Sequence, residues 1–257
     1  MTRSLACRVA IWGATAAVSI ACGEVPTLAD EIAYIAPIDL PAPAVALGDT
    51  LRDSFGRAAA IRVVAFDRNN NRIPDVTATF VVTSAPTGVS VSPAGFVVAK
   101  DSTGTLRLVA RIGDRLQTTE TSILVVPQPD SITMTGARLE GVSAPGVSAP
   151  MQVTVTGIRN GARVPVAGII VRYEITNLVP DAAVDSTRFR LLDDANNSLR
   201  SDPRVAMDTT RDGGTAERKL TVITAPGVTA VRVTVTAKSL RGAVLRGSPL
   251  TFIIPIK

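Results

Sequence analysis

The alternation of apolar and polar residues over short segments constrains the fold of this chain most strongly. The segment MQVTVT at 151–156 alternates in this way, and VRVTVTAK at 231–238 repeats the pattern. A period of two residues places one face of a strand in a core and the other in water, as in an antiparallel sheet. Gly, Pro and Asn interrupt the chain about every ten residues, as in a sandwich of short strands. The sequence therefore predicts an all-β protein.

An internal repeat indicates how these strands are grouped. Residues 61–83 run in the order strand, polar turn, proline and strand, and residues 151–176 have the same order. The tetrapeptide NRIP of the first copy corresponds to ARVP of the second. The copies start about ninety residues apart, close to the size of one immunoglobulin-like domain. We therefore expect two tandem immunoglobulin-like β-sandwiches over residues 31–127 and 128–257. The proline-stiffened segment VVPQPDSI at 125–132 would join them.

Two segments of the second half need separate interpretation. Residues 177–207 form a stretch longer than such a domain needs, and we interpret it as an inserted hairpin. The pentapeptide doublet GVSAPGVSAP at 141–150 is expected to be a loop after the first strand of the second domain. A chance connection rich in Pro and Gly is the alternative for this doublet.

The N-terminus has the features of a secretory signal. Residues 1–8 carry two arginines and no acid, and residues 9–21 carry no charge and end in small residues. This apolar run is too short for a spanning helix, which needs roughly 20 apolar residues. We expect a signal peptide over 1–21 and a tether over 22–30. Cys22 follows the expected cut, and no later cysteine exists to pair with it.

Charge is distributed unevenly along the mature chain. Residues 23–130 hold nine cations and twelve acids, a net charge of −3, whereas residues 131–257 hold sixteen cations and ten acids, a net charge of +6. A basic half is compatible with binding to an anionic lipid or polysaccharide, and also with an ordinary solvated surface. No aromatic residues are interleaved with these arginines, as binding of single-stranded nucleic acid requires. We expect no nucleic acid partner.

The composition also argues against catalysis. The chain has no histidine, so no Ser-His or Cys-His nucleophilic site can be built. Its four lysines lie in no recognisable catalytic motif, and the only tryptophan, Trp12, lies in the expected signal peptide. Few aromatic residues are left to line a sugar site. We therefore expect that the protein is not an enzyme and uses no cofactor.

Two oxygen-rich segments are weak candidates for binding a hard cation. Their candidate ligands are Asp67, Asn69 and Asn71 in the first, and Asp193 and Asp194 in the second. The first three have the spacing of an EF-hand loop, but Arg72 and Ala78 stand where that loop needs Gly and a bidentate Glu. We interpret both segments as turns, in which Asn tolerates positive φ, and expect no metal site.

The order of motifs in both halves resembles that of bacterial immunoglobulin-like domains of the invasin and intimin type. The first half carries LGDTL at 47–51, VSVSPAGFVVA at 89–99 and GTLRLVARIGD at 104–114, an order similar to the group-2 type. The second half carries DTTRDGGTAERKLTV at 208–222 before GVTAVRVTVTAK at 227–238, which is more similar to the invasin type. This resemblance covers nearly the whole mature chain and implies adhesin-like modules.

The N-terminus resembles a bacterial lipoprotein signal. In that family the cysteine after the cut, here Cys22, receives a diacylglyceryl thioether, and the new N-terminus receives a further chain. Two or more chains anchor a protein stably, whereas one gives marginal membrane binding. Gly23 stands where Asp would indicate inner-membrane retention, so the resemblance implies the outer membrane. Ordinary secretion, with Cys22 as a free thiol, is the alternative.

Together these resemblances imply an exported, lipid-anchored structural or interaction protein. It would display two immunoglobulin-like domains from the membrane, and either bind an unknown protein partner or act as a surface spacer. The alternative is a ligand-binding lipoprotein whose basic second domain captures an anionic glycan.

Overall fold

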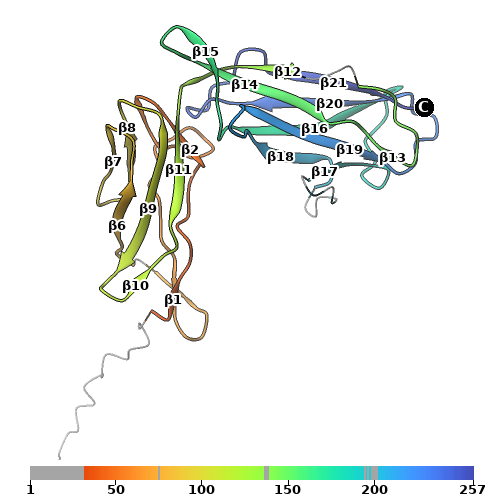
Figure 1. The fold of residues 1–257 in the computed structure, drawn as a ribbon. Helices are drawn as coiled ribbons and strands as arrows, with labels where there is room; N and C mark the ends of the chain where they lie inside the picture. The colour runs from red at the N-terminus through yellow and green to blue at the C-terminus, as the bar shows by residue number, and fades with distance from the viewer. Residues whose placement is uncertain (1–31, 75, 136–138, 194, 196, 198–201) are drawn as a thin grey trace, which may run out of the picture.

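The computed structural model describes residues 32–257, apart from 75, 136–138, 194, 196 and 198–201. It is an all-β structure with two separate hydrophobic cores, so the fold class expected from the sequence, two tandem sandwiches, is confirmed (Figure 1). Residues 1–31, which include Cys22 and the expected signal peptide, lie outside the described residues.

The first sandwich comprises the strands that precede residue 127. They are β1 (Tyr34–Ile35), β2 (Ala44–Ala46), β3 (Asp49–Thr50), β4 (Ala65–Phe66), β5 (Arg72–Ile73), β6 (Thr79–Ser84), β7 (Val89–Val91), β8 (Val97–Ala99), β9 (Gly104–Ile112), β10 (Leu116–Gln117) and β11 (Thr121–Val126). One sheet has the order β10-β9-β11-β2, with β6 also paired to β9, and two smaller sheets are β3-β8-β7 and β1-β4-β5. The long strand β9 buries Leu106 and Leu108 and exposes Arg107, as the alternation of a strand requires.

The second sandwich comprises the remaining strands. They are β12 (Pro129–Thr135), β13 (Gly146–Val147), β14 (Met151–Arg159), β15 (Ala162–Pro165), β16 (Ile170–Val179), β17 (Phe189–Leu192), β18 (Val205–Thr209), β19 (Thr215–Val222), β20 (Ala230–Ala237) and β21 (Leu250–Pro255). One sheet has the order β12-β14-β19-β13, with β15 on β14 and β17 on β19; the other is β18-β16-β20-β21. The alternation predicted at 151–156 and 231–238 is seen in β14 and β20, which bury every second residue over most of their length.

The stretch at 177–207 differs from the expected inserted hairpin. Within its described residues, β17 pairs with β19 of one sheet, whereas β18 pairs with β16 of the other. The physical reason is burial: Phe189, Leu191 and Ala206 are core residues, so these strands complete the sandwich instead of extending from it. The doublet at 141–150 also does more than connect strands, because β13 within it pairs with β19.

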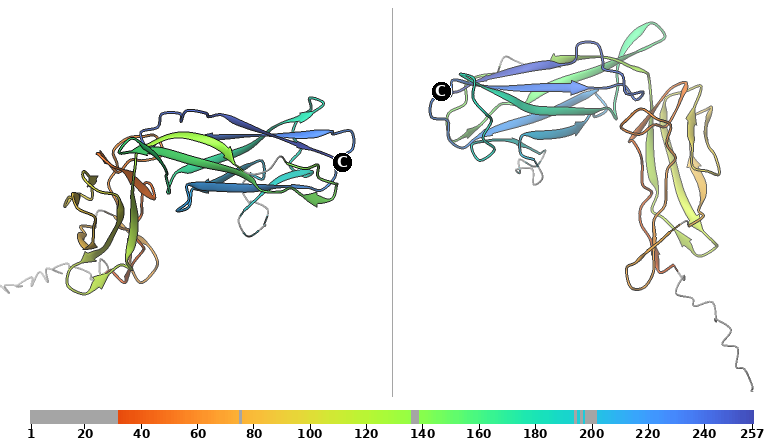
Figure 2. Two further views of the ribbon diagram at one scale, coloured as in Figure 1. Left: turned by 45° about the horizontal axis from the view of Figure 1, so that its top comes forward. Right: turned by 180° about the vertical axis from the view of Figure 1, so that it is seen from behind.

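The two sandwiches meet end to side, with their long axes at a marked angle (Figures 1 and 2). Strand β11 leads into β12 through a connection of two residues, so the predicted boundary between residues 127 and 128 lies between these strands. The described residues contain no helix that is long and apolar enough to cross a membrane.

Candidate functional site

The surface where the two sandwiches meet, which we call the junction, is the best-defined candidate site. Loop 53–56 of the first sandwich lies against loop 239–242 of the second, and their backbones approach very closely. A Cβ atom added to Gly56 would lie 2.3 Å from the carbonyl oxygen of Arg241, and Gly56 has a φ of +79°. A Cβ atom on Gly168 would lie 2.6 Å from the Cβ atom of Ala44. Glycine is therefore required on both sides of the contact.

A buried carboxylate ties the two sandwiches together at the same place. Asp49 of β3 is buried, with its side chain 5% exposed, and its Oδ2 accepts a 2.6 Å hydrogen bond from Nε of Arg241 in the second sandwich. Its Oδ1 accepts hydrogen bonds of 2.8 Å from Nη2 of Arg52 and from the amide of Thr50. Nη1 of Arg52 also donates to the carbonyl oxygen of Gly56, at 2.8 Å. The network therefore joins strand β3, the glycine loop and the second sandwich.

The charge on Asp49 is stabilised by these donors. Burial by itself raises the pKa of the carboxyl group, because a low-dielectric environment disfavours the charged form. The hydrogen bonds from Arg52, Arg241 and the Thr50 amide outweigh that effect and lower the pKa from 3.8 to about 2. Asp49 therefore stays ionised at neutral pH, and its ion pair with Arg241 is kept there.

The connection between β11 and β12 is also held from both sides. The amide of Leu47 donates to the carbonyl oxygen of Val126 at 2.8 Å, and the amide of Ile132 donates to the carbonyl oxygen of Arg246 at 2.9 Å. The guanidinium group of Arg246 pairs with the carboxylate of Asp130. These contacts fasten the connection to the first sandwich at one end and to the second at the other.

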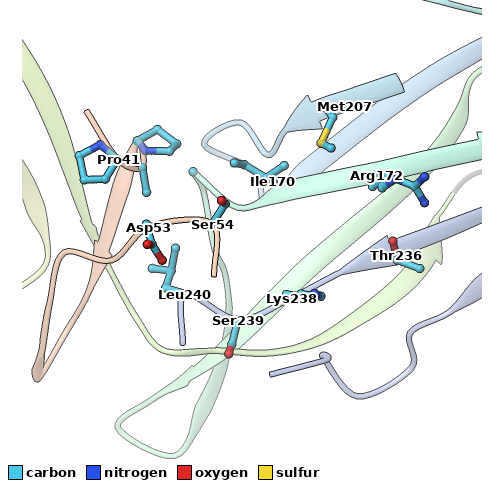
Figure 3. A pocket seen from close by; sticks show the side chains of 13 residues that line it. Pro41, Asp53, Ser54, Ile170, Arg172, Met207, Thr236, Lys238, Ser239 and Leu240 are labelled. Carbon is cyan, nitrogen blue, oxygen red and sulfur yellow. The ribbon is translucent and has the colours of Figure 1, made fainter. Parts of the chain in front are cut away.

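A pocket of about 250 Å³ opens at the junction (Figure 3). The first sandwich contributes residues 41–43 and 53–54 to its walls. The second contributes the outward face of strands β16 and β18, together with residues 236 and 238–240 around the end of β20. The pocket therefore exists only because the two sandwiches are docked.

Strand β6 is a second candidate surface, for binding a partner. It pairs with β9 on one side, and no pairing on its other side is found among the described residues. Residues 76–99, which contain this strand, have no charged side chain, and Val82 is 41% exposed. Unpaired N–H and C=O groups on an uncharged edge rich in β-branched residues are a template for adding another strand.

The structure places the first cation candidates in the turn between β4 and β5. Oδ1 of Asp67 accepts hydrogen bonds of 2.8 Å from the amides of Asn69 and Asn71, and the Asn71 side chain donates to Oδ2 at 3.0 Å. These bonds lower the pKa of Asp67, and the positive φ of 64° falls on Asn70. The Asp67 carboxylate is thus engaged by its own turn.

The remaining predicted site residues are only partly described. Oδ1 of Asp193 accepts a 2.7 Å hydrogen bond from the amide of Asn197, whereas Asp194 and Cys22 lie outside the described residues. Within the described part of the chain, no three His, Cys, Asp or Glu residues are grouped so that they could hold a metal ion.

Sequence reasoning did not find the junction. The motif LGDTL at 47–51 contains Asp49, but nothing in it indicates that Asp49 pairs with an arginine 192 residues later. The one available signal was the pair of sequences SFG and RG at 54–56 and 241–242, in which small residues permit a close approach.

Comparison with known proteins finds similarity at the level of three-dimensional structure alone. No family model matches the sequence, and no curated protein matches it. Among solved structures, the adhesin InvE of Yersinia pseudotuberculosis is similar at 18% identity and a TM-score of 0.34, over 87% of this chain and 58% of that one. This chain therefore spans little more than half the length of the InvE chain.

Two further solved structures are similar over 87% of this chain. Domains 4 and 5 of the S-layer protein SbsC align at 11% identity and a TM-score of 0.29, over 96% of that chain. The D00-D0 domains of intimin align at 12% identity and a TM-score of 0.27, over 99% of that chain. At such identities and TM-scores these similarities carry no functional argument, which must come from the residues of this chain.

Proposed function

We propose that this protein is an exported, lipid-anchored display protein without catalytic activity. Cys22 would carry the lipid, the outer membrane would hold it, and the two sandwiches would project from that membrane as a spacer or as a binding module. The junction is the single observation that most supports the display role in this proposal, whereas the anchoring rests on the sequence around Cys22. A display module must hold its binding surface at a fixed place, and the Asp49–Arg241 pair and the approach of Gly56 to Arg241 both restrict relative motion.

Within this proposal, partner binding is assigned to the edge strand β6. A partner protein would add an extended segment beside β6, with main-chain hydrogen bonds supplying affinity and alternate side chains supplying specificity. The stretch at 76–99 supports this assignment, because charged residues within an edge strand are a common protection of natural edges and this stretch contains none of its own; the one carboxylate that contacts β6 through a printed hydrogen bond is that of Glu120, bonded to Thr83.

The absence of catalysis is part of the same proposal. A chain without histidine has few routes to general acid–base chemistry near neutral pH. The most strongly perturbed carboxyl at the junction, that of Asp49, has its oxygens occupied by arginine and amide donors and is therefore a structural anion.

Mass spectrometry of the mature N-terminus tests the anchoring. We expect cleavage before Cys22 and a mass increase equal to a diacylglyceryl group and one further acyl chain. In a matched experiment, Cys22→Ser should release the protein from the membrane fraction, whereas Ser19→Ala should leave it there. An unmodified Cys22 in the mature protein would overturn the lipid anchor and leave ordinary secretion.

A second candidate function is capture of an anionic glycan by the second sandwich. The observation that favours it is the presence of Arg172, Arg232 and Lys238 on the outward face of the β18-β16-β20-β21 sheet or directly beyond β20. Binding to polygalacturonate that weakens steeply with added salt would favour this function. Binding to a protein partner that is lost in a Val82→Pro variant would favour strand addition to β6 instead.

A further inference from the structure

The floor of the junction pocket is an apolar patch on the outward face of the β18-β16-β20-β21 sheet. Ile170 and Met207 point outward from β16 and β18 and are 41% and 57% exposed. Across the strands, Ile170 is paired with Thr209 and Met207 with Arg172. Large apolar side chains left uncovered at a concave site are typical of a surface that binds something.

The wall of the pocket that the first sandwich contributes is also apolar, and it is conformationally rigid. Pro41 and Pro43 line the pocket from the first sandwich, and Leu240 lines it at the same end as Pro41 (Figure 3). Proline has a fixed φ, and the floor is a four-stranded sheet, so little conformational entropy is lost when a ligand enters. The pocket is therefore formed before any ligand arrives.

The far end of the pocket is cationic. Arg172 is the cross-strand partner of both Met207 and Thr236, and it lies at the opposite end of the pocket from Pro41 (Figure 3). Lys238 follows Thr236 by two residues and also lines the pocket. No hydrogen bond or ion pair of the Lys238 side chain is found among the described residues, whereas Arg172 pairs with Glu174 of its own strand.

The one acidic residue of the lining is already engaged. Oδ1 of Asp53 accepts hydrogen bonds of 2.9 Å from the amides of Phe55 and Arg57, and Oδ2 pairs with Nε of Arg57 at 3.3 Å. Its charge is therefore balanced within its own loop. The pocket as a whole combines apolar walls with a cationic end, where Arg172 is paired with Glu174 and Lys238 has no such partner among the described residues.

We propose that the junction pocket binds a small amphipathic monoanion. Its apolar body would lie between Pro41 and Pro43 on one side and Met207 and Ile170 on the other, and its anionic group would contact Lys238 and Arg172. The volume of about 250 Å³ is below the roughly 300–1,000 Å³ of pockets that enclose drug-sized ligands, which favours a short chain or a single ring.

Methyl NMR tests this proposal directly, because the chain has four methionines, at positions 1, 134, 151 and 207. The protein is labelled on the methionine methyl groups and titrated with sodium decanoate below its micelle concentration. We expect the Met207 signal to shift and saturate. Met134, which is similarly exposed but lies on β12, and the buried Met151 should stay unchanged.

Two control ligands test the need for a negative charge. Neutral decanol and cationic decylammonium should bind at least tenfold more weakly than decanoate.

Two pairs of variants test the location of the site. Lys238→Glu should weaken decanoate binding about tenfold, whereas Lys100→Glu, in the first sandwich, should not. Ile170→Asp should abolish binding, whereas Ile253→Asp, an exposed site of the same sheet outside the pocket, should leave it intact. An unshifted Met207, equal binding of decanol, or equal effects of the paired variants would overturn the proposal.

Discussion

The two sandwiches differ in the types of side chain that form their hydrophobic cores. The buried core of the second contains Tyr173, Phe189 and Phe252, whereas that of the first contains aliphatic residues, with Phe80 packed against it and partly exposed. Aromatic side chains bury the largest areas and dominate core energetics. The first sandwich is therefore expected to gain less stability from its own core than the second sandwich does.

The junction compensates for this difference. Ala44 and Val126, which belong to strands of the first sandwich, pack into the core cluster of the second. Docking thus buries additional apolar surface of the first sandwich, which has the smaller core of its own. The ion pair between Asp49 and Arg241 adds a polar contact at the same junction. The first sandwich therefore depends on docking to the second for part of its apolar burial.

Removal of an aromatic ring from the second core should have the largest effect. Phe189→Ala should lower the free energy of unfolding by ~3–5 kcal/mol, because it leaves a cavity in a fully buried site. In urea we expect two transitions, with the first sandwich unfolding earlier, and Phe189→Ala should move the later one. Leu106→Ala, in the first core, should move the earlier one. A single transition that both variants shift equally would show that the two sandwiches do not differ in stability.

Substitution at the closest backbone approach should be next in size. Gly56→Ala should weaken docking by ~1–3 kcal/mol, since alanine is strained at positive φ and its Cβ would meet the carbonyl of Arg241. Gly48→Ala is the matched control, with a φ of +75° and nothing within 4 Å of the added atom. Small-angle scattering should show a changed shape for Gly56→Ala and an unchanged one for the control. The same scattering change in both variants would assign the effect to strain alone.

The Asp49 network predicts a dependence of stability on pH. The folded-state pKa of about 2 lies below the ordinary value of 3.8, so the ionised form is favoured by folding. This contributes about 2 kcal/mol, fully present above about pH 4 and lost as the pH falls toward 2. Urea unfolding at several pH values should show the loss, and Asp49→Asn should be less stable at neutral pH and lack this dependence. A stability of Asp49→Asn equal to that of the natural chain at pH 7 would refute the role of the carboxylate.

The smallest effect is expected on the open face of the first sandwich. Arg107 and Glu120 form a 3.0 Å ion pair, but both side chains are exposed, and such pairs contribute less than about 1 kcal/mol. Glu120→Gln should therefore leave both unfolding transitions almost where they are. A shift as large as that of Asp49→Asn would contradict this expectation, because it would mean that exposed and buried carboxylates contribute equally to the free energy of unfolding.

The parts of the structure that can be predicted from the sequence are those set by the order of apolar and polar residues within a single strand. Strands β14 and β20 follow from alternation in the sequence, because each buries one face along its length. The sequence predicts one inserted hairpin where β17 and β18 lie, because a local pattern does not reveal that the two strands join different sheets. The Asp49–Arg241 contact was beyond sequence reasoning, because it depends on how two complete sandwiches dock.

A distance measurement between the two sandwiches tests whether they form one docked unit. Spin labels on cysteines replacing Asp114 and Thr224, both exposed and on different sandwiches, can be measured by pulsed electron paramagnetic resonance with Cys7 and Cys22 replaced by serine. We expect a single narrow distance distribution that broadens in Gly56→Ala and in Asp49→Asn. A distribution that is already broad in the otherwise unchanged chain would contradict that expectation.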